Sequence, residues 1–302
     1  MVSRTSHLPH FFTVDVEEYF HVNAFERAIS RDAWSSWPKR LDRCVPLLLD
    51  ALDRHGARGT FFVLGWVAEH EPDIVHRIAS AGHEIASHGY WHRRIPTLTP
   101  ERFREDVRKS KQCLEDLVGR PVIGFRAPSF SIIPGTEWSF DVLIEEGFRY
   151  DSSLFPIRRR GYGYPSARRH PHLITRSAGS IAEFPLATME VAGLTLPAAG
   201  GAYLRHLPSL LIHRAFAQAS ERGGGATFYV HPWELDPAQP AVPVSVLTRL
   251  RHYRGLAGML DRVEHLLRRF PFTAIANILD DVLSGAGASP PVTIPRAAPE
   301  PA

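Results

Sequence analysis

The segment SHGYWH, residues 87–92, carries two histidines four residues apart. On one helical turn, His88 and His92 would share a face, with about 5–6 Å between their Cβ atoms. That spacing suits two ligands of one tetrahedral or octahedral metal ion. Because the chain has 16 histidines, pairs at this spacing also arise by chance. The pair therefore indicates a metal site only if further ligands converge on it.

Three carboxylates, Asp15, Glu17 and Glu18, end an apolar run near the start of the chain. In a continuing strand, Asp15 and Glu17 point to the same side. Two carboxylates that share a site repel and shift each other's pKa. A metal would relieve the repulsion by taking one of them, and the other could then act as general base toward an activated water. The alternative is a solvated acidic turn.

Two basic side chains follow other apolar runs. Arg126 comes after residues 122–125 and before a loop fixed by proline, where a guanidinium can pair with a carboxylate and hold it ionised. His231 stands between the run 226–230 and a Pro-Trp pair, which suits a proton donor to a leaving group. The ordinary alternatives are a surface ion pair for Arg126 and a hydrogen-bonded core histidine for His231.

Short apolar strands alternate with amphipathic helices along the chain. We expect strands at 10–16, 60–64, 83–87, 122–125, 183–187, 226–230 and 272–278. We expect helices at 41–52, 74–81, 100–118, 136–146, 208–222 and 244–270, the last broken near Gly255. This alternation predicts an α/β fold with a mainly parallel sheet, closed or nearly closed as a barrel of about seven strands. The candidate side chains follow strand ends, the rim where parallel barrels collect their catalytic groups.

Composition narrows the class of protein. The 302 residues are 44% hydrophobic, which excludes disorder of the whole chain and allows one large core. A net charge of +3 does not by itself indicate nucleic-acid binding. The chain has only two cysteines, Cys44 and Cys113, which excludes a disulfide framework. The sequence shows neither a secretory signal nor a transmembrane run, so we expect a cytoplasmic protein. The tail 283–302, rich in Pro and Ala, is expected to be disordered.

Six segments together resemble a known family. They read TVDVEEYFHV, GTFFVLGWVAE, HEIASHGYWH, FRAPSFSI, YDSSLFP and YVHPWELD. They are similar to the polysaccharide deacetylases, the NodB-homology domain of carbohydrate esterase family 4. The similarity covers residues 10–280 and is closest to the branch found beside exopolysaccharide and exosortase genes, which has a C-terminal extension of the DUF3473 type. It implies a distorted (β/α)7 barrel in one domain, 1–282, with the extension at about 230–282.

The resemblance implies a metal site built from the first two motifs. Asp15 matches the catalytic base of the family. Val16 stands where the family has a second Asp, so Glu17 is the expected carboxylate ligand and Glu18 the alternative. His88 and His92 match the histidine ligands. The implied metal is Zn²⁺, with Co²⁺, Ni²⁺ or Mn²⁺ as substitutes.

In the second motif, Gly89 replaces a hydroxyl residue of the family, and we expect its absence to loosen the loop between the two histidines.

The resemblance also implies the remaining roles. Arg126 matches the arginine that orients the base, and the backbone N–H of Ser129 matches a donor to the developing oxyanion. His231 matches the general acid, and Asp151 the residue that supports it. Trp233 is expected to line the sugar pocket.

The implied reaction is metal-assisted removal of N-acetyl groups from amino sugars of a polysaccharide or oligosaccharide, with release of acetate. An exopolysaccharide or its precursor is the expected substrate. The alternatives are a metal-free cyclic-amide hydrolase of the allantoinase-like subset, a non-catalytic carbohydrate-binding relative, and a scaffold protein. The Gly-rich segment 197–203 is interpreted as a tight turn before a helix rather than a ligand cradle. The sequence leaves the oligomeric state open.

Overall fold

The computed structural model describes residues 9–159, 161–285 and 292–293. Within these residues, seven parallel strands lie side by side in the order β10-β1-β2-β3-β4-β5-β7. Their bounds are β1 His10–Val16, β2 Thr60–Val63, β3 Glu84–Ser87, β4 Gly124–Phe125, β5 Tyr150–Asp151, β7 Gly179–Glu183 and β10 Thr227–Val230. A parallel bridge between Leu186, just after β7, and Thr227 of β10 joins the two ends of this row. The expected (β/α)7 barrel is thus confirmed, with few hydrogen bonds at its closing seam.

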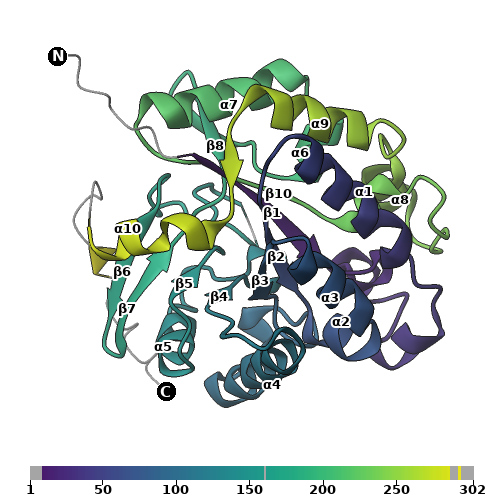
Figure 1. The fold of residues 1–302 in the computed structure, drawn as a ribbon, viewed down its shortest axis with the longest axis horizontal. Helices are drawn as coiled ribbons and strands as arrows, with labels where there is room; N and C mark the ends of the chain where they lie inside the picture. Colours follow the sequence, from purple (N-terminus) through teal and green to yellow (C-terminus); the bar gives the residue numbers. More distant parts are fainter. Residues whose placement is uncertain (1–8, 160, 286–291, 294–302) are drawn as a thin grey trace.

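Helices surround the barrel (Figure 1). They are α1 Leu41–Arg54, α2 Gly65–His70, α3 Pro72–Ser80, α4 Pro100–Val118, α5 Trp138–Glu145, α6 Gly201–His206, α7 Ser209–Glu221, α8 Val246–Tyr253, α9 Met259–Arg269 and α10 Leu279–Leu283. The bounds of α4 follow from its ends, since Thr99 accepts the backbone N–H of Arg102 at 3.4 Å and Gly119 leaves the helix with φ 66°. The break expected near Gly255 is confirmed, since α8 ends at Tyr253 and α9 begins at Met259.

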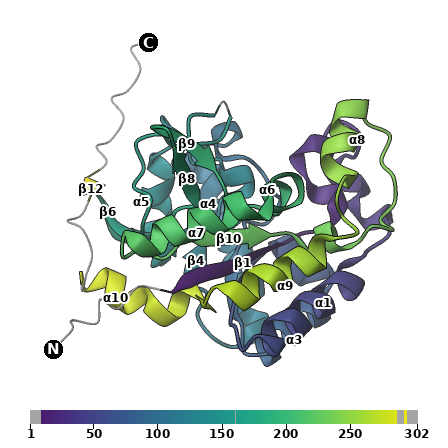
Figure 2. The same cartoon turned by 90° about the horizontal axis from the view of Figure 1, so that it is seen from above.

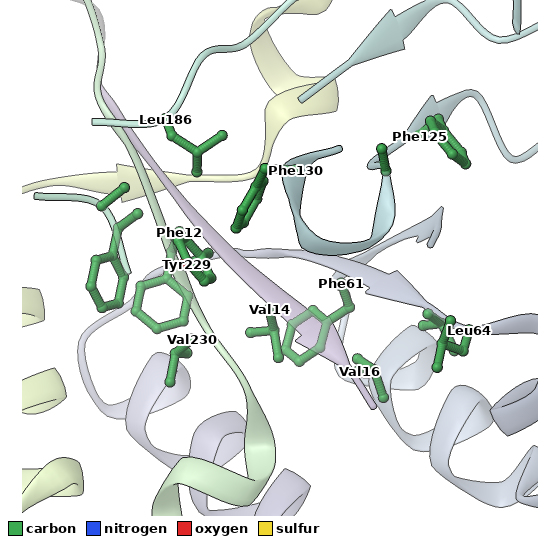
Figure 3. Packing of buried hydrophobic residues seen from close by; sticks show 14 of the residues in the cluster. Phe12, Val14, Val16, Phe61, Leu64, Phe125, Phe130, Leu186, Tyr229 and Val230 are labelled. Atoms are coloured by element: carbon green, nitrogen blue, oxygen red, sulfur yellow. The ribbon is translucent and has the colours of Figure 1, made fainter. Parts of the chain in front are cut away.

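Strand β1 shows how the barrel positions its polar rim. Every one of its side chains is buried, as expected for a parallel strand covered on both faces. Phe12, Val14 and Val16 pack outward against neighbouring strands and helices (Figure 3). Successive side chains alternate between the two faces of a strand, so Thr13 and Asp15 belong to the inner face. The inner face therefore changes from apolar at the start of β1 to polar at its C-terminal end.

Several pieces lie outside the seven-stranded row. Strand β6 (His172–Arg176) pairs antiparallel with β7, and β8 (Thr188–Val191) forms a hairpin with β9 (Leu194–Pro197). Strand β11 (Phe272–Thr273) adds to the start of β1. Short 3₁₀ segments, Tyr19–His21, Asn23–Phe25 and Arg31–Ser36, connect β1 to α1. Figure 2 shows this N-terminal connection beside α8, at the end of the molecule away from β6.

Most of the tail expected to be disordered, residues 286–291 and 294–302, lies outside the described residues. Within that range, Val292–Thr293 form the short strand β12, which pairs with β6. Among the helices that the structure describes, none combines the length and the apolar character needed to cross a bilayer.

Candidate active site

A cavity of about 390 Å³ opens at the C-terminal ends of the barrel strands. Its lining includes six of the residues singled out from the sequence: Asp15, Glu17, His88, His92, Ser129 and His231. Asp15 lies near the C-terminal end of β1, and the other five residues follow β1, β3, β4 and β10, so four different strands of the barrel position the six. The parallel sheet thus gathers at one edge side chains that lie up to 216 residues apart in the sequence.

Glu17, His88 and His92 form a buried cluster whose possible ligand atoms all lie within 4.8 Å of one another. Nδ1 of His88 is 2.8 Å from the carbonyl oxygen of Arg126, an interaction that leaves Nε2 for a metal. Oε2 of Glu17 lies 2.9 Å from Nε2 of His92. Neither this oxygen nor Nδ1 of His92 makes a hydrogen bond of acceptable geometry with the described residues. Two imidazoles and one carboxylate, buried and converging, fit a Zn²⁺-type site.

The two neighbouring glutamates have opposite environments. Burial would raise the pKa of Glu17, but the attraction of His92 and His231 outweighs it and holds that pKa well below its usual value. Glu18 points instead to the start of α1, where it accepts the backbone N–H groups of Arg40 and Leu41. Burial raises the pKa of Glu18 to about 8. Glu17 is therefore the carboxylate that joins the histidine pair.

The two histidines do not lie on a helical turn, so that expectation is wrong. Residues 88–92 form a loop, in which Gly89 has φ 73° and His92 has φ 50°. The carboxylate of Asp106 accepts the backbone N–H groups of Tyr90 at 2.7 Å and Trp91 at 3.2 Å. A Cβ atom on Gly89 would lie 2.8 Å from Oδ2 of Asp106. The glycine thus admits an anchoring carboxylate, and the loop is tied down rather than loosened.

Arg126 holds Asp15 in one orientation. Its Nη1 donates to Oδ1 of Asp15 at 2.7 Å and to the hydroxyl of Thr13 at 2.7 Å. Nε and Nη2 donate to the carbonyl and the hydroxyl of Ser152 at 2.9 and 2.8 Å, and the guanidinium lies over the ring of Phe62. Arg126 is fully buried. With every donating nitrogen engaged, the guanidinium can neutralise Asp15 without moving toward the cavity.

His231 faces Asp15 across the cavity floor. Its Nε2 lies 3.3 Å from Oε1 of Glu17 and 4.0 Å from Oδ2 of Asp15. Its Nδ1 lies 3.2 Å from Oε2 of Glu234, and the same oxygen accepts the backbone N–H of His231 at 3.0 Å. Burial lowers the pKa of His231, but the carboxylates of Glu17, Glu234 and Asp15 outweigh burial and raise it to about 9. The imidazole thus has the surroundings of a proton donor.

Asp151 is not the partner of His231, and the role expected for it is wrong. It accepts the backbone N–H and the hydroxyl of Ser153 at 2.8 and 2.7 Å, and it stands opposite Glu183 in the neighbouring strand β7. Burial and the charge of Asp151 raise the pKa of Glu183 well above its usual value. The carboxylate beside His231 comes from Glu234, three residues along the chain.

Glu234 is itself held on its far side. Oε1 accepts Nε of Arg205 at 3.0 Å, and both side chains are almost completely buried. Nη1 of Arg205 also donates to the carbonyls of His252 at 2.9 Å and Arg254 at 2.7 Å. A Cβ atom on Gly201 would lie 2.0 Å from Oε2 of Glu234. Only a glycine there lets α6 approach this carboxylate closely.

Trp233 does not line the cavity, contrary to expectation. Its indole stacks on the ring of His231, with centroids 5.0 Å apart, and on that of His252, with centroids 4.3 Å apart. Its Nε1 donates to Oε1 of Glu17 at 3.4 Å. Trp233 therefore positions His231 and Glu17 without facing the cavity.

Part of the cavity wall comes from Asn23 and Tyr203, which were not predicted from the sequence as site residues. Tyr162 and Tyr203 line the cavity with their hydroxyls 3.3 Å apart. Asn23 donates to the hydroxyl of Ser129 at 2.9 Å, and the backbone of Ser129 is left-handed, with φ 54°. Tyr203 belongs to the Gly-rich segment interpreted as a turn, which in fact supplies part of the wall. The pair Gly200-Gly201, separated from this tyrosine by Ala202, was the available signal for a close approach.

Two family models match the chain. Residues 33–137 match the model described as "Polysaccharide deacetylase", and residues 152–280 match "Domain of unknown function (DUF3473)". Over residues 33–137 the chain is therefore similar to the polysaccharide deacetylases. The second match begins at residue 152, so it includes β7, β10 and the acid side of the cavity. The boundary expected at about residue 230 stays a prediction.

Curated relatives match in part. A peptidoglycan-N-acetylglucosamine deacetylase of Bacillus cereus is 31% identical over 120 residues, 36% of this chain and 44% of the relative. A chitooligosaccharide deacetylase of Bradyrhizobium is 27% identical over 100 residues, 33% of this chain and 43% of the relative. The matched stretches thus span less than half of these relatives. A crystal structure from Mycobacterium smegmatis, of a protein assigned to the polysaccharide deacetylases, superposes with a TM-score of 0.63 at 21% identity, covering 97% of this chain and 95% of that one. This likeness supports the fold.

Proposed function

We propose that this protein is a metal-dependent hydrolase that removes N-acetyl groups from amino sugars of a polysaccharide or oligosaccharide and releases acetate. The observation that carries the proposal is the grouping of three functions on one cavity. A three-ligand cluster lines the same cavity as an arginine-fixed carboxylate, Asp15, and a carboxylate-backed imidazole, His231. Hydrolysis of an amide needs these three functions: an electrophile, a base for water and an acid for the amine.

Glu17, His88 and His92 would hold the cation. Zn²⁺ is the metal we propose, because the donor set is two imidazoles and one carboxylate. When bound, a divalent cation supplies polarisation of the acetyl carbonyl and eases the ionisation of water. Around it, Asp15 takes one proton from the attacking water as the new C–O bond forms. Arg126 keeps the receiving oxygen aimed at the cavity.

The second half of the reaction breaks the C–N bond. His231 gives the proton of its Nε2 to the departing amine nitrogen, and Glu234 balances the charge of the imidazolium before the transfer. The backbone N–H of Ser129 is proposed as a donor to the oxyanion. The products are acetate and a free amino sugar.

The cavity walls favour a sugar ring as the bound group. Phe130, Tyr162, Tyr203 and Tyr229 line the cavity, and aromatic faces offer sugar C–H groups a large apolar surface while tyrosine hydroxyls bond at the edge. The names of the matched relatives, which refer to peptidoglycan and chitooligosaccharide, point to N-acetylglucosamine as a first substrate. An exopolysaccharide or its precursor remains our proposal for the natural polymer.

The test is acetate release from N-acetylglucosamine oligomers by the purified chain. The protein is stripped with a chelator and assayed with and without added Zn²⁺ or Co²⁺, beside Asp15→Asn and His88→Ala. We expect the unaltered chain to release acetate only when metal is added. We expect neither variant to release acetate. Bound metal without release would reject this substrate, and release that survives both chelation and His88→Ala would favour a metal-free amidase.

A further inference from the structure

We propose that the α8 segment is a docking surface for an anionic lipid bilayer. Three aliphatic side chains of this helix are exposed to solvent, Val246 by 82%, Leu247 by 58% and Leu250 by 54%. They lie at positions i, i+1 and i+4, which places them on one face of the helix. Exposed aliphatic residues grouped in this way mark interaction sites more often than single ones do.

The charges around this face have one sign. Arg249, Arg251 and Arg254 are exposed beside the three aliphatic residues, and within the described part of the chain none of the three has an ion pair with a carboxylate. The sequence holds no Asp or Glu from 237 to 260. Aliphatic side chains interleaved with arginines suit the boundary between anionic headgroups and acyl chains.

A hollow beside the helix fits a headgroup. It measures about 490 Å³, and Arg249 and Arg254 line it together with Tyr253 and Leu250. The guanidinium groups can bind a phosphate, while the aliphatic residues beside them enter the acyl region. A protein partner would need about 800 Å² of matched surface, whereas this helix is short and lies at the edge of the molecule (Figure 2).

The surface lies next to the cavity. Phe25 packs on the rings of His252 and Tyr253 of α8, and the residues just before it, 22–24, line the cavity. Arg205, which holds Glu234, also binds the carbonyl of His252. A bilayer bound at α8 would therefore hold the entrance close to substrates at the membrane surface.

The test measures sedimentation of the full chain with vesicles of phosphatidylcholine containing 30% phosphatidylglycerol, and with phosphatidylcholine alone. We expect binding to the anionic vesicles that weakens with salt. Replacing Val246, Leu247 and Leu250 by Gln should lower the partition coefficient at least tenfold. Replacing one arginine, as in Arg249→Gln, should lower it about fivefold, since each basic residue near an anionic surface contributes about 1 kcal/mol.

The matched control is Leu194→Gln with Leu210→Gln, two exposed leucines of β9 and α7, which should bind like the unaltered chain. Equal loss in the control, or no binding by the unaltered chain, would overturn the proposal. Sedimentation velocity without lipid tests whether a second copy of the chain covers this face instead. If the unaltered chain is a dimer and the α8 variant is a monomer, the face is a contact between copies and the docking proposal is refuted. None of these readouts depends on the deacetylase reaction.

Discussion

Replacing Glu234 by Gln is expected to slow the reaction because it removes the charge behind His231. The glutamine keeps the size of the side chain, and its amide can still meet Arg205. What it loses is the ionised oxygen 3.2 Å from Nδ1 of His231. A hydrogen bond to a charged group contributes about 1.5–3 kcal/mol, and each 1.4 kcal/mol is a factor of ten. If the bond matters only when the imidazolium forms, kcat should fall by about 10- to 150-fold.

The assay is steady-state acetate release from N-acetylglucosamine oligomers, with Zn²⁺ saturating and the folded fraction measured by circular dichroism. We expect KM to change less than threefold, because Glu234 is absent from the cavity lining. Glu234→Asp, which restores the charge on a shorter side chain, should recover part of kcat. The control for the loss of any carboxylate is Glu190→Gln, since Glu190 is half-exposed and does not line the cavity.

The competing prediction concerns Asp151. If Asp151 supported His231, Asp151→Asn would lower kcat per folded molecule more than Glu234→Gln does. That order of effects, or an unchanged kcat in Glu234→Gln, would refute the reasoning. If Glu234→Gln lowered only the stability of the fold and left kcat per folded molecule unchanged, the reasoning would also be refuted. The lost pairing with the buried Arg205 would then explain the whole loss of activity.

Three further results are expected. Zn²⁺ should raise the melting temperature of the chelated chain but not that of His88→Ala, as differential scanning fluorimetry with Mg²⁺ as control can show; equal shifts would exclude the cluster as the metal site. Arg126→Lys should destabilise the fold by about 3 kcal/mol in urea titrations, since a lysine cannot meet the four acceptors of a fully buried guanidinium; a loss below 1 kcal/mol would contradict this account. Burial lowers the pKa of His10 to about 4, so below the unfolded value of about 6.5 the unfolded chain takes up the proton first and stability falls. Between pH 7.5 and 5.5 this costs about 1 kcal/mol, and His10→Gln should lose that much less stability over the same range; an equal loss would show that His10 is not responsible.

The sequence was sufficient to predict the bounds of elements that are defined by their own residues. Strand β1 and helix α4 have the expected bounds, because a run rich in aromatic and β-branched residues defines the strand and a Thr–Gly pair of caps defines the helix. Strands β6, β8 and β9 were not expected. Their partly exposed sides mix polar with apolar residues, so their existence depends on the partner strand rather than on their own pattern.

The ligand cluster was predictable for a similar reason. His88 and His92 follow one strand and Glu17 another, and the parallel order of β1, β2 and β3 brings strand ends to one edge. The local geometry was not predictable. The loop that aims the histidines is shaped by Asp106, a residue of α4, and no spacing within 87–92 reveals a contact with a helix that follows it.

The resemblance to the family did not decide correctly which carboxylate is the partner of His231. Asp151 and Glu234 both follow strand ends, so position along the chain does not distinguish them as partners of His231. The contacts decide between them. Asp151 binds Ser153 rather than the imidazole. The missing side chain at Gly201 lets Glu234 and Arg205 pair next to His231.

The region matched by the DUF3473 model is therefore part of the candidate active site rather than an appendage to it. His231, Glu234 and Arg205 all lie within residues 152–280, whereas Glu17 precedes the polysaccharide deacetylase match and His88 lies inside it. Neither part alone contains both an acid and a metal cluster. A truncation at residue 151 would remove β7 and β10 from the barrel as well as the proton donor. The two matched regions thus contribute strands to one barrel and residues to one cavity, and we expect neither to bind or to hydrolyse the proposed substrate without the other.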